Sequence, residues 1–216
     1  MVENFTYAKV VDHFYWGVKV DDLSLGNTSL DIYATDTMDL VSVIDTGTSL
    51  IYIDKGTYRK MLAEFKALGI TCKLNHRFYY CKAKKDKFPP FKATIAGKQM
   101  EIPGEDYLFY AGEPDTYYIL IVPINIGGYF KRLALFGDIF MRRYYTIFNE
   151  DDMTIGFAKA QLDRKIIEET AELTIIKDDD DWYIHLSRKL VALTLVFISI
   201  AIVYYYGGST KPNSSD

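Results

Sequence analysis

Residues 41–50 read VSVIDTGTSL, and a second apolar run, IYI, follows directly at residues 51–53. The mostly β-branched apolar residues before Asp45 are typical of a buried strand. The strand then enters a turn rich in hydroxyl groups, where Gly47 permits a sharp bend and the close approach of a ligand. A carboxylate between two apolar strands costs free energy unless it is hydrogen-bonded or shares a proton. The stretch therefore predicts one carboxylate that is presented from the core on a tight loop.

The simplest alternative for this stretch is a surface turn, since Asp-x-Gly is common in turns. A solvated hairpin tip, however, does not need apolar residues on both sides of the acid. A second motif, LALFGDIFMRRYYTIFN, lies at residues 133–149. It predicts an apolar strand, a Gly137-Asp138 step, a short helix and another strand. Gly137 suits a close pass beside the Asp45 turn, and Asp138 is suited to N-cap the short helix.

These two motifs together resemble the pepsin-like aspartic proteases, in the lobe that carries the second of their two catalytic aspartates. The resemblance covers residues 6–160 and includes YWGVKV at residues 15–20 and the closing turn and strand at residues 151–158. It implies an all-β, pepsin-like acid protease fold, present as a single C-terminal lobe at residues 1–160. The chain would begin where such a protease crosses from its first lobe to its second.

Short strands and one helix fill the rest of this predicted lobe. Aromatic residues make up 15% of the sequence, and 18 of them are Tyr, which favours strands. Tyr58, Met61, Leu62 and Phe65 recur at helical spacing before Gly69, which predicts an amphipathic helix at residues 55–68. Further strands are predicted at residues 6–10, 14–20, 78–81, 91–97, 98–102 and 117–126.

The resemblance also implies roles for the residues of the turn. Asp45 would be the second-lobe catalytic carboxylate of an aspartic endopeptidase that acts at acidic pH. Thr46 would make the hydrogen bond that braces the two catalytic loops, and Gly47 and Thr48 would contact the substrate backbone, with Ser49 completing the substrate-binding turn. The substrate would be a polypeptide, and neither a metal nor an organic cofactor is implied.

Asp-Thr-Gly occurs once in the sequence, whereas the aspartic dyad needs two carboxylates. Three interpretations follow. The first is the C-terminal half of a bilobal protease, inactive alone because the first lobe is missing. The second is a homodimer in which each copy supplies Asp45. The third is a non-catalytic, membrane-tethered peptide-binding lobe.

Cys72 and Cys81 are the two cysteines of the chain. Two thiols without a suitable histidine cluster argue against a structural zinc site. The family resemblance implies a disulfide between them, and hence an oxidising compartment. The basic run at residues 82–87 is short in a chain of formal net charge −4, so nucleic acid is not an expected partner.

After residue 160 the sequence changes in character. Residues 161–185 form a charged segment that predicts a stalk or linker, and residues 186–206 predict a single transmembrane helix. Its uncharged part, residues 190–206, sits at the short end of the roughly 17–25 residues that span a bilayer. A buried core helix or a signal for a lipid anchor are the alternatives. Residues 207–216 form a short polar tail.

The orientation of this predicted membrane protein rests on opposing signals. Arg188 and Lys189 precede the apolar run and favour a cytoplasmic domain. The implied disulfide, together with glycosylation triplets at Asn4 and Asn27, favours a lumenal one. We expect a lumenal protease domain in an acidic endomembrane compartment, or an extracellular one.

Overall fold

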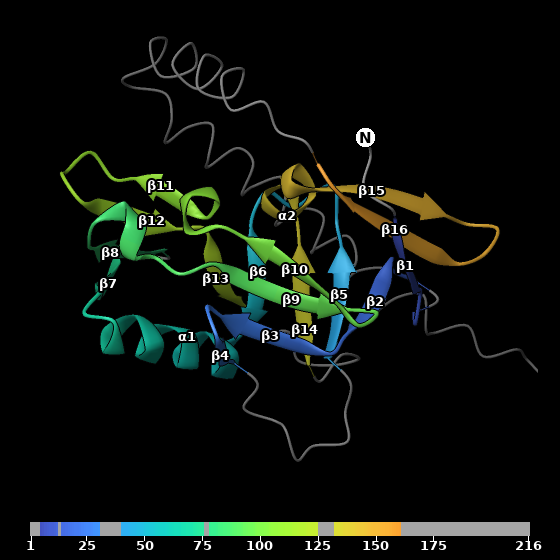
Figure 1. Ribbon diagram of the computed structural model, residues 1–216, viewed down its shortest axis with the longest axis horizontal. Helices are drawn as coiled ribbons and strands as arrows, with labels where there is room; N and C mark the ends of the chain where they lie inside the picture. Colours follow the sequence, from blue (N-terminus) through green and yellow to red (C-terminus); the bar gives the residue numbers. More distant parts are fainter. Residues whose placement is uncertain (1–4, 13, 31–39, 76–77, 125–131, 161–216) are drawn as a thin grey trace, which may run out of the picture. The chain divides into compact units, whose positions relative to one another are not determined.

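The computed structural model describes residues 5–12, 14–30, 40–75, 78–124 and 132–160 (Figure 1). Met1–Gln161 form one compact unit. Strands dominate the described part, as the sequence predicts for a pepsin-like fold, and they build four sheets.

A five-stranded mixed sheet organises the unit, in the order β13-β6-β14-β5-β2. Two of its neighbouring pairs are parallel, β5 with β14 and β6 with β13. Because Ile44 lies opposite Phe136 in the parallel pair, the chain leaves both strands at the same edge of the sheet. The strands are β2 (Gly17–Val20), β5 (Leu40–Ile44), β6 (Ile51–Asp54), β13 (Ile121–Ile124) and β14 (Leu133–Phe136).

Three smaller sheets surround this one, and their neighbouring strands are all antiparallel. The first, β1-β16-β15, consists of β1 (Thr6–Lys9), β15 (Tyr144–Asn149) and β16 (Thr154–Lys159). The second, β10-β9-β3-β4, consists of β3 (Asp22–Leu25), β4 (Thr28–Ser29), β9 (Phe91–Ile95) and β10 (Lys98–Ile102). The third, β11-β12-β8-β7, consists of β7 (Thr71–Asn75), β8 (Phe78–Lys82), β11 (Leu108–Tyr110) and β12 (Thr116–Ile119). Figure 1 shows the first and third sheets at opposite ends of the unit.

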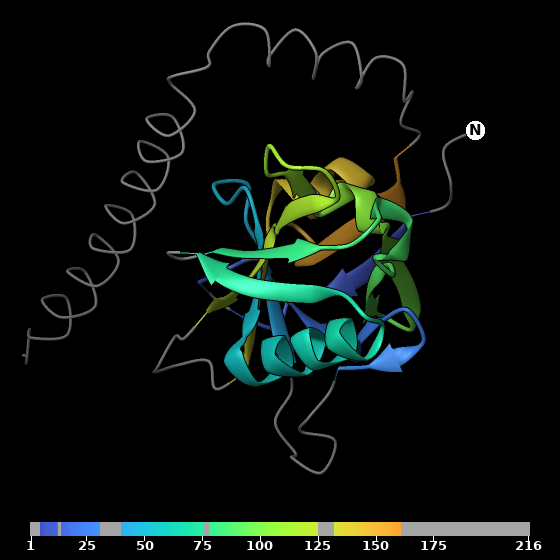
Figure 2. The same cartoon turned by 90° about the vertical axis from the view of Figure 1, so that its left-hand side faces the viewer.

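Two α-helices and two short 3-10 turns complete the described elements: α1 (Lys55–Ala67), α2 (Asp138–Arg143), η1 (Lys85–Lys87) and η2 (Gly104–Asp106). The helix α1 confirms the prediction at residues 55–68, and Figure 2 shows it along one side of the unit. Of its predicted apolar stripe, Tyr58, Met61 and Phe65 are buried and Leu62 is half-buried. This face packs into a core whose largest fully buried side chains include Phe91, Phe136, Phe140, Phe157 and Tyr107.

The strand predicted at residues 117–126 is wrong in one respect, because it is interrupted at Leu120. The Leu120 N–H donates to the carbonyl of Tyr107, while the Leu120 carbonyl accepts the N–H of Ile51. These two partners belong to different parts of the fold, so the chain passes here from the sheet of β12 to the sheet of β13.

The strand predicted at residues 14–20 begins later, at Gly17. The buried carboxylate of Asp12 accepts the backbone N–H groups of Phe14 and Tyr15, both at 2.8 Å. This local turn competes with the sheet for the backbone donors of the two aromatic residues. The aromatic composition that favoured a strand is therefore overridden by an aspartate just before it.

The disulfide implied by the family resemblance is confirmed. Cys72 on β7 and Cys81 on β8 lie directly opposite each other and are bonded. The described part of the chain holds no free cysteine.

The segments predicted as stalk, membrane span and polar tail, residues 161–185, 186–206 and 207–216, lie outside the described residues. Within the described ranges, no helix combines the length and the apolar character needed to cross a membrane.

Two buried tyrosines differ in whether their hydroxyl group is bonded. The Tyr107 hydroxyl donates to the Pro89 carbonyl at 2.6 Å, whereas the Tyr58 hydroxyl has no hydrogen-bond partner among the described residues. Burial raises the pKa of both phenols, and the neighbouring Tyr79 raises that of Tyr58 further.

We expect Tyr58→Phe to leave the free energy of unfolding unchanged or to raise it by up to about 1 kcal/mol, because it removes an unsatisfied buried oxygen. Tyr107→Phe should lower it by about 1 kcal/mol, because it removes a hydrogen bond. Urea denaturation of the two variants measures the difference. A greater loss in Tyr58→Phe than in Tyr107→Phe would contradict this assignment.

Candidate active site

Asp45 lies at the edge of the five-stranded sheet where β5 and β14 both end. Its backbone N–H donates to the carbonyl of Phe136 at 3.1 Å, which extends the β5–β14 ladder by one residue. The Asp45 side chain is half-buried, and the next two residues, Thr46 and Gly47, are exposed. The sequence prediction of a carboxylate presented from a buried strand is therefore confirmed.

The loop after β5 fixes the orientation of the carboxylate. The Gly47 N–H donates to Asp45 Oδ1 at 2.9 Å, and the Thr48 hydroxyl donates to Oδ2 at 2.5 Å. The Thr48 side chain is only 1% exposed, so the solvent does not compete for its hydroxyl. Each carboxylate oxygen accepts one of these bonds and keeps a second lone pair for another donor.

The second sequence motif, at Gly137 and Asp138, contacts this loop through backbone hydrogen bonds. The Asp138 N–H donates to the carbonyl of Thr48 at 2.8 Å, and the Gly137 N–H donates to that of Leu50 at 3.1 Å. A Cβ atom at Gly137 would lie 2.0 Å from the Thr48 oxygen. The two segments are therefore in direct backbone contact, and the role expected for Gly137 is confirmed.

The N-cap predicted at Asp138 is wrong. Gly137 occupies the N-cap of α2, and Asp138 is the first residue of the helix, with an exposed side chain. The position of Asp138 is set by its backbone N–H, which is bonded to Thr48. Its carboxylate lies in the first turn, where negative charge is favourable.

Asp54 makes the same pair of contacts as Asp45. It accepts the Gly56 N–H at 2.8 Å and the Thr57 hydroxyl at 2.5 Å, and there the carboxylate caps α1. The hydrogen-bond pattern of Asp-x-Gly-Thr is thus not sufficient to identify a catalytic loop. What sets Asp45 apart is that a strand follows its loop, and that the segment at Gly137 pins the loop from outside.

The predicted site residues fall into two groups. Thr46 and Gly47 are exposed beside Asp45, while Thr48 points inward with its hydroxyl on the carboxylate, and Ser49 is half-buried. Sequence reasoning missed the carbonyl of Phe136, which accepts the Asp45 N–H. Phe136 ends the apolar strand before Gly137, and that position was the signal in the sequence. The parallel register that aligns Phe136 with Ile44, however, is a non-local contact that a local pattern does not predict.

We expect Thr48→Val to lower the free energy of unfolding by about 1–2 kcal/mol, because it leaves a carboxylate oxygen without its buried hydroxyl donor. Thr57→Val provides a benchmark, since it removes the equivalent bond to Asp54 and should cost a similar amount. Chemical denaturation at neutral pH measures both. A Thr48→Val variant as stable as the unmodified chain would show that the hydroxyl does not hold Asp45.

Comparison with known proteins agrees with this geometry. Residues 2–160 match the eukaryotic aspartyl protease family. Cathepsin D of Chionodraco hamatus is 28% identical over 160 residues, which are 73% of this chain and 39% of that protein. The vacuolar aspartic protease of Candida albicans is 28% identical over 159 residues, or 73% and 35% of the two chains. The probable vacuolar protease A of Trichophyton verrucosum is 30% identical over 149 residues, or 68% and 34%.

The chain thus spans 34% to 39% of the length of these curated relatives. The family match covers 159 of its 216 residues and includes both the Asp45 loop and the Gly137 segment that pins it. The chain therefore belongs to the eukaryotic aspartyl protease family.

Proposed function

We propose that this chain contributes Asp45 to an aspartic endopeptidase that hydrolyses peptide bonds at acidic pH. The observation that carries the proposal is the Asp45 loop itself. Its carboxylate is oriented by Gly47 and Thr48, and it stands beside two exposed residues at the end of a buried strand. Family membership supports the same chemistry.

In the proposed reaction, Asp45 and a second carboxylate share one proton and hold a water molecule between them. One carboxylate removes a proton from the water, whose oxygen attacks the scissile carbonyl, while the other protonates the carbonyl oxygen. The tetrahedral intermediate then releases the amine, which leaves with a proton from the pair. Two carboxylates at such a short separation cannot both ionise easily. They therefore titrate as a coupled pair, and activity requires acidic pH.

The second carboxylate must come from outside the Asp45 loop. We propose a bilobal assembly as the first source, in which another lobe brings its own Asp-Thr-Gly, and a second copy of this chain as the alternative. In either assembly Thr46, which is exposed, would bond across to the opposite loop. The exposed Gly47 backbone would meet an extended substrate, while the buried Thr48 would hold the Asp45 carboxylate through its hydroxyl.

Cleavage of a denatured protein at acidic pH tests the source of the second carboxylate. The purified chain is assayed over a wide concentration range, alone and after fusion to the first lobe of a related cathepsin D. A rate that rises with the square of concentration identifies a second copy, and cleavage only in the fusion identifies a bilobal enzyme. A folded, disulfide-bonded chain that cleaves nothing in either arm would contradict the proposal and favour a peptide-binding lobe.

We further propose that the chain is anchored by residues 186–206, with its protease domain in an acidic compartment. The uncharged run in the sequence and the vacuolar names of two relatives support this. Alkaline carbonate extraction of cells that express the chain tests the anchor, because a spanning protein stays in the membrane pellet. Release of the chain into the supernatant would contradict the membrane anchor. A lack of overlap with an acidotropic dye in the same cells would contradict the acidic compartment.

A further inference from the structure

The position of Asp45 depends on the segment that runs from Phe136 to Asp138. This segment receives the Asp45 N–H on the Phe136 carbonyl and donates the Asp138 N–H to Thr48, so it grips the loop at both ends. Anything that fixes the segment therefore fixes the direction in which the carboxylate points.

An aromatic stack leads away from this segment through α2. The rings of Phe136 and Phe140 stack with centroids 4.8 Å apart, and those of Phe140 and Tyr144 with centroids 5.2 Å apart. All three side chains are buried, and Phe157 on β16 packs edge-on against Phe140 at 5.7 Å. Close-packed rings transmit displacement, because the interior has few voids to absorb it.

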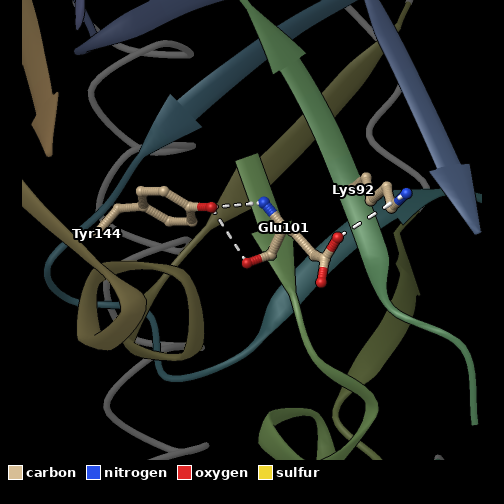
Figure 3. Close-up of polar contacts among 3 residues, drawn as sticks. All are labelled: Lys92, Glu101 and Tyr144. Atoms are coloured by element: carbon tan, nitrogen blue, oxygen red, sulfur yellow. Dashed lines mark hydrogen bonds and ion pairs between the residues drawn. The ribbon is translucent and has the colours of Figure 1, made fainter. Parts of the chain in front are cut away.

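The far end of the stack is bound to another sheet. The Tyr144 hydroxyl accepts the backbone N–H of Glu101 and donates to the carbonyl of the same residue at 3.1 Å (Figure 3). Because β10 is an edge strand, the hydroxyl satisfies backbone groups that its partner strand β9 leaves open. Lys92 and Glu101 pair on the other side of the strand at 3.8 Å.

An ion pair also links the end of α2 to the same region. Arg143 Nε lies 3.0 Å from Asp106 Oδ2, in the turn η2 that follows β10. The C-terminal end of α2 is therefore held at two adjacent points on one neighbouring segment.

We propose that Tyr144 is a positioning residue for Asp45. Its hydroxyl anchors the stack of Phe136, Phe140 and Tyr144 on β10, and the stack in turn holds the carbonyl that receives the Asp45 N–H. Tyr144 would act on Asp45 through this stack and not on the reacting atoms themselves. Its consequence for catalysis rests on the proposed function, whereas its effect on the loop does not.

Hydrogen exchange of the Asp45 and Asp138 amides in the full chain tests this inference without any need for activity. In Tyr144→Phe we expect both amides to exchange about fivefold faster or more, as the loss of one net hydrogen bond would produce. Tyr107→Phe is the matched control, because it also removes a buried phenol bond but lies outside the stack. It should leave these two amides unchanged after correction for global stability.

Two outcomes overturn the proposal. Either the two variants raise exchange at Asp45 equally, which means that the effect is global, or Tyr144→Phe affects only the Glu101 amide. If Tyr144→Phe does not fold, Arg143→Gln removes the adjacent tie and should accelerate the same two amides. In a preparation that cleaves peptide, Tyr144→Phe should also lower kcat about fivefold with KM unchanged, and an unchanged kcat would contradict the effect of Tyr144 on catalysis. Absence of cleavage by the unmodified chain would instead count against the proposed function and leave the exchange test intact.

Discussion

Gly137→Ala should lower the free energy of unfolding by about 3 kcal/mol or more, the upper range for overpacking a buried site. The added methyl group would lie 2.0 Å from the Thr48 carbonyl oxygen and 2.7 Å from that of Leu50. Both obstacles are backbone atoms, which cannot rotate away as a side chain would. Relief requires separation of the two segments, and that would break the Asp138–Thr48 and Gly137–Leu50 hydrogen bonds.

Gly47→Ala is the control for this substitution, since it adds the same methyl group to the Asp45 loop that the Gly137 segment contacts. There the new atom would meet only the end of the Asp45 side chain, at 3.3 Å. We expect its loss of stability to be well below that of Gly137→Ala, measured by the midpoint of chemical denaturation. Equal losses would mean that the contact between the two segments is not what makes glycine necessary at position 137.

Local patterns predicted much of this site, because they specify each piece of chain separately. The apolar run before Asp45, the helical stripe of α1 and the Gly137 motif all lie where the sequence places them. Each depends on interactions between neighbours in the chain, namely strand propensity, helical spacing and a turn that needs glycine. The disulfide was implied by the family resemblance, since the presence of two cysteines does not by itself show that they are bonded.

The misplaced features depend on contacts between distant residues or on a single competing side chain. Leu120 ends a strand because its two backbone groups bond to Tyr107 and Ile51, which no local pattern encodes. The Asp12 carboxylate accepts two backbone N–H groups that a strand would otherwise use, so β2 begins later than predicted. The hydrogen bond between Tyr144 and Glu101 on β10 joins residues 43 positions apart, and no local pattern around either residue predicts it.

Asp45→Asn should reduce peptide cleavage by a factor of about 10³ or more, because an amide can neither remove a proton from water nor share one with a second carboxylate. The fold should survive, since asparagine has the same shape and its carbonyl oxygen can still accept the Thr48 hydroxyl or the Gly47 N–H. A loss of activity in Asp45→Asn can therefore be distinguished from a loss of structure.

Asp54→Asn is the matched control for Asp45→Asn. Asp54 accepts the same two kinds of donor in the same geometry, but it caps α1. Asparagine is itself a good N-cap, so this variant should remain folded and keep its activity.

The most direct test of the account compares the cleavage of a denatured protein at acidic pH by the unmodified chain, Asp45→Asn and Asp54→Asn. Each is assayed in the assembly that is active, either the fusion to a first lobe or the pair of copies. We predict that the unmodified chain and Asp54→Asn cleave at similar rates, while Asp45→Asn shows almost none. Asp45→Asn cleaving as fast as Asp54→Asn, with both variants folded, would contradict the assignment of Asp45 as the catalytic carboxylate.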